Sequence, residues 1–140
     1  MAFHISVYRA SDLAFVQHPQ HDVGSDAFDA WTDEVDTLTL YENPLGAGDT
    51  IHRYWSAPAE TLGLPIIARL YNDGLVVLPP QFQQLDDELI RLEQYWETLD
   101  WSQEAQGGNP PFSSHLREHA GYVHEAIRIA RSHGGVILVR

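Results

Sequence analysis

The chain has 140 residues and a formal net charge of −12, and it contains neither cysteine nor lysine. The missing cysteine excludes disulfides, thiol nucleophiles and cysteine-ligated zinc, and the missing lysine excludes Schiff-base chemistry and the lysine of a phosphate-binding loop. The negative charge disfavours nucleic acids and anionic membrane surfaces as partners, because both are themselves negatively charged.

The length is typical of one domain, so we expect residues 1–140 to fold as a single unit. Five Phe, six Tyr and four Trp supply the large side chains that a packed core needs. No apolar run approaches the ~18 residues that a membrane helix requires. The N-terminus lacks the basic and apolar regions of a signal peptide, and we therefore expect a cytoplasmic protein.

The N-terminal third of the chain predicts two strands separated by an irregular connection. Apolar and polar residues alternate over residues 3–8, which is the pattern of a half-buried strand. Residues 11–31 have no regular period and are expected to form a long connection. Alternation resumes over residues 34–41 and predicts the second strand. Asn, Pro and Gly in residues 43–49 then predict a turn.

Three short runs in the middle of the chain, residues 50–55, 66–71 and 75–78, are rich in β-branched and aromatic side chains and predict further strands. An Asp-Gly pair at positions 73–74 separates the last two runs. Because both residue types tolerate a positive φ, this pair predicts a tight hairpin. Two prolines follow and end the last of these strands.

The remaining sequence predicts two long helices and a closing strand. Apolar side chains recur every three or four positions over residues 82–99 and again over residues 113–133, as on the buried face of a helix. Ser113 suits the N-cap of the second helix, and Gly134 suits its C-terminal cap. The run at 136–139 is apolar on both faces, so we expect a strand in the centre of the sheet.

Charged side chains flank the apolar stripe of each long helix. An acidic row on the first helix can face a basic row on the second, or both rows can be solvated, in which case any ion pairs contribute little. The acidic row comprises Asp86, Glu93 and Glu97, and the basic row comprises Arg117, His124, Arg128 and Arg131.

The segment His115-Leu116-Arg117-Glu118-His119 fits H-x-x-E-H, a zinc-peptidase pattern in which two histidines one helical turn apart bind the metal. A third ligand is missing. Only 21 residues follow His119, and their one acidic residue, Glu125, lies about 120° around the helix. We therefore expect no metal and no cofactor, and we interpret both histidines as half-buried packing residues.

Other candidate sites are less specific. His18 and His21 with Asp22 have the spacing of metal ligands, but no further ligands are identifiable. His52 and Arg53 can bind a small anion, although a strand with mixed faces explains them equally well. Carboxylate pairs are too abundant to identify a glycosidase-type pair. The sequence therefore nominates no catalytic residue.

These elements predict an α+β fold, with a mostly antiparallel sheet of about five to six strands packed against two long helices from the C-terminal half. Most of the sheet comes from the first 80 residues. The strand at 136–139 completes it.

The first of two candidate functions is a non-catalytic, acidic protein-binding module that docks on a basic protein partner, as a bacterial immunity or antitoxin-type protein docks on a cationic toxin. Between His21 and Thr50 there are eight acidic residues and no Arg. Charge complementarity would steer such a partner to this region, although acidity also serves solubility alone. The expected contact residues are Asp26, Asp29, Trp31, Asp33, Glu34 and Asp36.

The second candidate function is a small-molecule-binding protein or an enzyme that uses histidines. Its site would lie in a pocket between the sheet and the helices, and would contain either His115 with His119 or His52 with Arg53. The sequence leaves the partner, the ligand, any reaction and the oligomeric state open.

Overall fold

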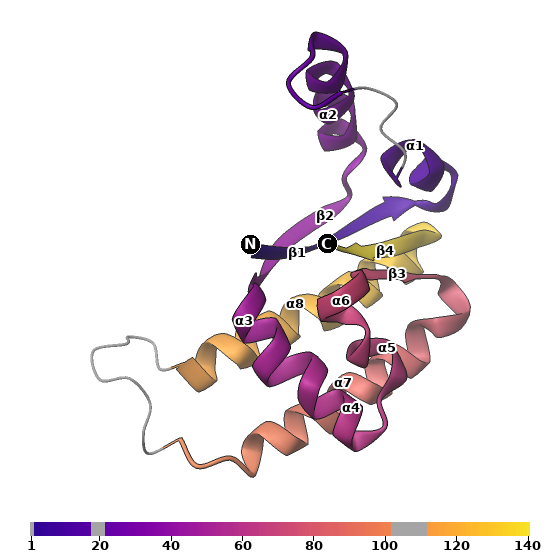
Figure 1. The fold of residues 1–140 in the computed structure, drawn as a ribbon. Helices are drawn as coiled ribbons and strands as arrows, with labels where there is room; N and C mark the ends of the chain where they lie inside the picture. Colours follow the sequence, from indigo (N-terminus) through magenta and orange to yellow (C-terminus); the bar gives the residue numbers. More distant parts are fainter. Residues whose placement is uncertain (1, 18–21, 102–111) are drawn as a thin grey trace.

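An antiparallel sheet lies at the centre of the structure (Figure 1). The structure is a computed structural model that describes residues 2–17, 22–101 and 112–140. The α+β class and the antiparallel sheet are confirmed, but the predicted number of strands is wrong, because the described residues form four. In the order of the sheet these are β2 (Tyr41–Ala47), β1 (Ala2–Arg9), β4 (Gly135–Val139) and β3 (Leu75–Val77).

Helices make up most of the rest of the described chain. The two long helices that the apolar spacing predicts are present as α7 (Phe82–Glu97) and α8 (Phe112–His133). None of the described helices is long and apolar enough to cross a membrane. The shorter helical segments are η1 (Ala10–Asp12), α1 (Leu13–Gln17), α2 (Asp26–Leu38), α3 (Gly48–Thr50), η2 (Ile51–Ser56), α4 (Ala57–Leu62), α5 (Pro65–Ala68), α6 (Leu70–Asp73) and η3 (Pro79–Gln81).

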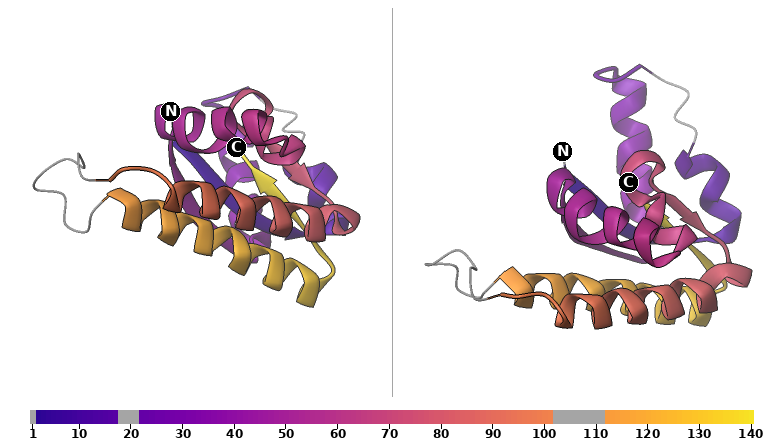
Figure 2. Two further views of the ribbon diagram at one scale, coloured as in Figure 1. Left: turned by 90° about the horizontal axis from the view of Figure 1, so that it is seen from below. Right: turned by 60° about the horizontal axis from the view of Figure 1, so that its bottom comes forward.

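One face of the sheet carries the larger part of the core. Helix α8 lies against β1, β2 and β4, and α7 runs beside α8 and packs on α4 and α5 (Figure 2). Strand residues such as Ile5, Val7 and Ile137 point into this layer and are fully buried. All of β4 is buried between β1 and β3, which confirms the central position predicted for residues 136–139.

The opposite face of the sheet is covered by α1 and α2. Tyr8, Val136 and Leu138 point to this side and pack against Val16 of α1 and Val35 of α2. The cover ends before β3, where the outward-facing side chain of this edge strand, Val76, is 39% exposed. The N-terminal helices therefore form a second, smaller core on the sheet.

The strand predicted over residues 34–41 is wrong, because most of it belongs to α2. Ser25 caps this helix by accepting a hydrogen bond from the Phe28 N–H at 3.0 Å. Apolar side chains then recur at helical spacing on the side that faces the sheet. The cap and this spacing were both present in the sequence, but the local alternation of Thr and Val obscured them. The side chains concerned are Phe28, Trp31, Val35 and Leu38.

The strands predicted over residues 50–55 and 66–71 are also wrong. The first is part of a continuous helical stretch formed by α3, η2 and α4, and the second forms α5 and α6. Pro65 lies in the first turn of α5, where proline is tolerated. Gly63 ends α4 with a φ of +74°. Burial of β-branched side chains from these helices outweighs their preference for strands.

The predicted turn at residues 43–49 is instead largely strand β2. Pro44 is tolerated there because β2 is an edge strand. The register shifts between Phe3 and His4, which leaves Leu45 as the extra residue of a bulge, and its side chain is buried.

The predicted hairpin at residues 73–74 does not form. Gly74 has the expected positive φ, +66°, but it ends helix α6 and leads into β3. Residues 102–111, between the two long helices, lie outside the described residues.

Candidate functional site

Helix α2 extends away from the body of the protein and carries the predicted contact residues (Figure 1). Its apolar side is fixed to the sheet by Val35 and to α1 by Trp31, whose indole N–H donates to the Phe15 carbonyl at 2.9 Å. Trp31 therefore lies on the inner side of the helix and is only partly exposed. It positions α2 and does not lie among the acidic side chains.

Four aspartates form one outward row on α2, spaced three, four and three residues apart. At about 100° per residue this spacing confines them to roughly 80° of the helix circumference, opposite the side that packs on the sheet. All four are exposed. Glu34 is also exposed, but it lies on the flank of the helix. We call this row the acidic face of α2; it consists of Asp26, Asp29, Asp33 and Asp36.

The acidic face has no counter-charge within the described residues. The ion pairs formed there involve other carboxylates, those of Asp86, Glu93 and Glu125. Helix α2 has no basic residue in its last turn, although a cation is favoured there by the helix dipole. A negative charge stabilises a helix near its start, but near its end it interacts unfavourably with the helix dipole. Helix stability therefore does not explain why an aspartate occupies position 36.

The histidines of the H-x-x-E-H pattern lie on α8 next to β2, with ring centroids 6.5 Å apart. Burial lowers the pKa of His119, and a hydrogen bond to the backbone of Leu45 opposes that effect. Glu118 instead accepts a hydrogen bond from the Tyr122 hydroxyl at 2.5 Å, which raises the pKa of that phenol. Within the described ranges no three His, Asp or Glu side chains are grouped to hold a metal, and His18 and His21 fall outside these ranges.

The charged rows of α7 and α8 meet at one point. His124 lies between two carboxylates of α7, with Nδ1 2.7 Å from Asp86 Oδ1 and Nε2 2.8 Å from Glu93 Oε1. Arg128 pairs within its own helix with Glu125, and Arg131 donates to Gln83 on α7 at 3.2 Å. The predicted contact between the rows is therefore made mainly by His124.

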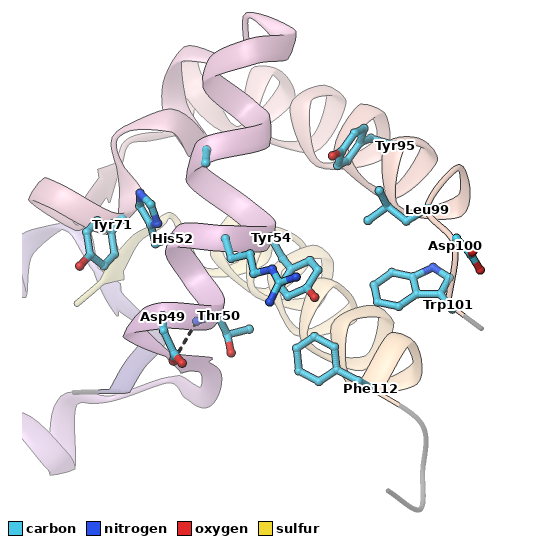
Figure 3. A pocket seen from close by; sticks show the side chains of 12 residues that line it. Asp49, Thr50, His52, Tyr54, Tyr71, Tyr95, Leu99, Asp100, Trp101 and Phe112 are labelled. Carbon is cyan, nitrogen blue, oxygen red and sulfur yellow. Dashed lines mark hydrogen bonds between the residues drawn. The ribbon is translucent and has the colours of Figure 1, made fainter. Parts of the chain in front are cut away.

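His52 and Arg53 line an open groove of about 1110 Å³ (Figure 3). It lies between η2 on one side and the end of α7 with the start of α8 on the other, and not between sheet and helices as predicted. His115 and His119 do not line it. We call it the aromatic groove; its main lining side chains are His52, Arg53, Tyr54, Tyr95, Trp101 and Phe112.

Three rings of the aromatic groove pack against one another. The Tyr54 ring centroid is 5.9 Å from that of Trp101 and 5.1 Å from that of Phe112. The Trp101 indole N–H is already bonded to the Trp96 carbonyl at 2.9 Å, which fixes this ring at the end of α7. Tyr95 projects from α7 into the same space (Figure 3). Spatial convergence alone creates the groove, so the sequence could not reveal it.

The π-helix η2 presents His52, Arg53 and Tyr54 to the groove. Pro58 has no N–H, so the Tyr54 carbonyl four residues earlier lacks its α-helical donor. The Trp96 indole N–H supplies a hydrogen bond to this carbonyl at 2.7 Å. The same helical segment places Trp55 in the core, 1% exposed and in edge contact with Trp96. π-Helical segments occur frequently at functional sites.

Comparisons with known proteins do not assign a role to either surface. No protein-family model matches the chain. Searches of curated proteins and of solved structures also found no significant match.

Proposed function

We propose that this chain is a non-catalytic protein-binding module whose acidic face on α2 docks on a basic protein partner, in the manner of a bacterial immunity or antitoxin-type protein. The observation that carries the proposal is the outward row of Asp26, Asp29, Asp33 and Asp36. A row of like charges on one projecting helix is suited to a complementary cationic surface, and it raises the rate of encounter with such a partner.

Two features favour binding over a role in solubility alone. Solubility requires net charge but no particular arrangement, whereas these four carboxylates share one side of one helix. The side chain of Val23, 85% exposed, also lies three residues before Asp26, next to the start of this helix. Apolar contacts beside complementary charges are what a specific interface needs, because charges at a rim contribute little affinity by themselves.

Charge reversal of the acidic face tests the proposal. The tagged chain is co-expressed with each protein encoded by its neighbouring genes, and the captured proteins are identified after purification. We expect a basic protein to be captured by the wild type and lost from the variant Asp29→Arg, Asp33→Arg, Asp36→Arg. Capture should also weaken with added salt, because screening reduces attraction between exposed charges.

The matched control reverses three exposed carboxylates on other helices, with the variant Asp73→Arg, Asp87→Arg, Glu97→Arg. It changes the net charge by the same amount but leaves the acidic face intact, so it should retain the partner. Circular dichroism establishes that both variants are folded. Unchanged capture by the folded α2 variant would show that the acidic face is not the binding surface.

A further inference from the structure

Rings supplied by separate parts of the chain line the aromatic groove. Tyr71 and His52 stand at one end, with ring centroids 4.8 Å apart. Tyr54 lies in the middle, and Tyr95 and Trp101 line the other wall (Figure 3). Such a series of rings offers several contact points along an extended ligand.

The groove contains several hydrogen-bond donors that have no acceptor among the described residues. Within the described ranges, no acceptor is bonded to the hydroxyls of Tyr54, Tyr71 and Tyr95. Among the described residues the Arg53 guanidinium makes no hydrogen bond or ion pair, and it lies 5.2 Å from the Tyr54 ring centroid. Acceptors are present as well: Asp49 accepts a hydrogen bond from the Thr50 N–H at 3.0 Å and keeps further acceptor sites, and Asp100 also lines the groove. The groove therefore suits a ligand that brings apolar faces and acceptors.

We infer that the aromatic groove binds a proline-rich segment of another protein in the polyproline II conformation. Proline contributes a carbonyl acceptor and no N–H donor, and its ring packs flat on aromatic side chains. A polyproline II helix has no internal hydrogen bonds, so its carbonyls are free to accept from the tyrosine hydroxyls and Arg53. Its stiffness also reduces the entropy lost on binding.

The extent and charge of the groove favour this ligand over the alternatives. The lining rings come from η2, α6, α7 and the start of α8, so a ligand that contacts all of them is extended. A nucleic acid would also stack on the rings, but the net charge of −12 opposes it.

This binding site is separate from the acidic face. The groove belongs to the helical layer on one side of the sheet, whereas α2 extends from the other side (Figure 1). The inference therefore does not depend on the proposed function, and either can fail without the other.

Titration of the full chain with synthetic peptides tests the inference. The probes are a blocked nonaproline and a blocked peptide with two Pro-x-x-Pro repeats, with a scrambled Gly/Ser peptide as the negative control. Tryptophan fluorescence, to which Trp101 contributes together with the three other tryptophans, follows binding, and amide chemical shifts in NMR spectra locate the site. We expect saturable binding with shifts confined to η2, the end of α7 and the start of α8.

Single substitutions separate groove contacts from general effects. Tyr95→Ala should weaken peptide binding by about tenfold or more, as expected for an aromatic contact residue, and Tyr95→Phe by a few-fold because it removes only the donor. Arg53→Ala should also weaken binding a few-fold. Phe15→Ala removes an exposed ring outside the groove and should leave binding unchanged, as should the charge-reversed α2 variant.

Three results would overturn the inference. They are the absence of any shift at millimolar peptide, binding that survives Tyr95→Ala in the folded variant, and saturable binding of soluble oligosaccharides in place of the peptides.

Discussion

The buried carboxylate of Glu88 gives the sharpest test of how this fold is held together. Glu88 lies on α7 and is only 4% exposed. Its Oε1 accepts hydrogen bonds from the N–H groups of Ile66 and Ile67, both at 3.0 Å, and its Oε2 accepts one from Gln84 at 2.9 Å. It therefore caps the start of α5, where two backbone N–H groups lack helical partners.

Replacing Glu88 with alanine should cost about 4 kcal/mol of unfolding free energy. Each buried N–H that loses its acceptor costs ~1–3 kcal/mol, and two are affected. Against a total stability of roughly 5–15 kcal/mol, this is a large loss. Glu88→Gln retains an oxygen for both N–H groups but loses the charge and the oxygen that accepts from the Gln84 amide, so it should cost about 1–2 kcal/mol.

Urea unfolding followed by tryptophan fluorescence measures both values. With a slope of ~1–3 kcal/mol/M, Glu88→Ala should lower the midpoint by well over 1 M. The neighbouring Asp87 is exposed and, among the described residues, bonds only to Gln83, so Asp87→Ala should change stability by less than ~0.5 kcal/mol. A cost below ~1 kcal/mol for Glu88→Ala, or equal costs for the alanine and glutamine variants, would refute this account of the cap.

Three further predictions concern His119, Gly74 and Trp96. Burial lowers the pKa of folded His119 below its ordinary value of 6.5, so the contribution of this side chain to stability is complete above that pH and is lost as the pH falls through the folded pKa. His119→Gln should therefore flatten this part of a curve of unfolding free energy against pH, and an unchanged curve would contradict the prediction. Gly74→Ala should cost more than Gly63→Ala in urea unfolding, because both have positive φ but only at Gly74 would the new Cβ meet a backbone oxygen, at 2.6 Å; equal costs would be inconsistent with this contact. Trp96→Phe leaves the Tyr54 carbonyl without its indole donor and should cost ~1–3 kcal/mol while shifting the NMR signals of η2, whereas unmoved η2 signals would show that the bond does not hold this segment.

Long periodic patterns in the sequence determined several elements of this fold correctly. The stripe through Leu85 and Leu89 of α7 specifies a helix, because only a period near 3.6 brings these side chains onto one buried side. The alternation of apolar and polar residues around Ile5 specifies β1, because a period of two brings the apolar side chains onto one buried face of a strand. The all-apolar run of β4 can be buried on both faces only in the interior of the sheet.

Tertiary packing decided whether the short segments formed helices or strands. Ile66 and Ile67 favour strands by local preference, yet both are buried in α5, where the carboxylate of Glu88 from a distant helix accepts their N–H groups. Val35 lies in a stretch that alternates like a strand, yet it packs on the sheet from helix α2. Such runs are too short for their periodicity to distinguish the two structures.

The two candidate sites also differ in how much of each the sequence could predict. The sequence by itself determined how many acidic residues surround Asp33 and Asp36, but not the direction in which their side chains project. On a strand these two side chains would project from opposite faces, whereas the helical period of α2 places them in one row. The aromatic groove was decided only by tertiary structure, because Tyr54, Tyr95 and Trp101 are far apart in the chain and converge where η2 packs beside the end of α7.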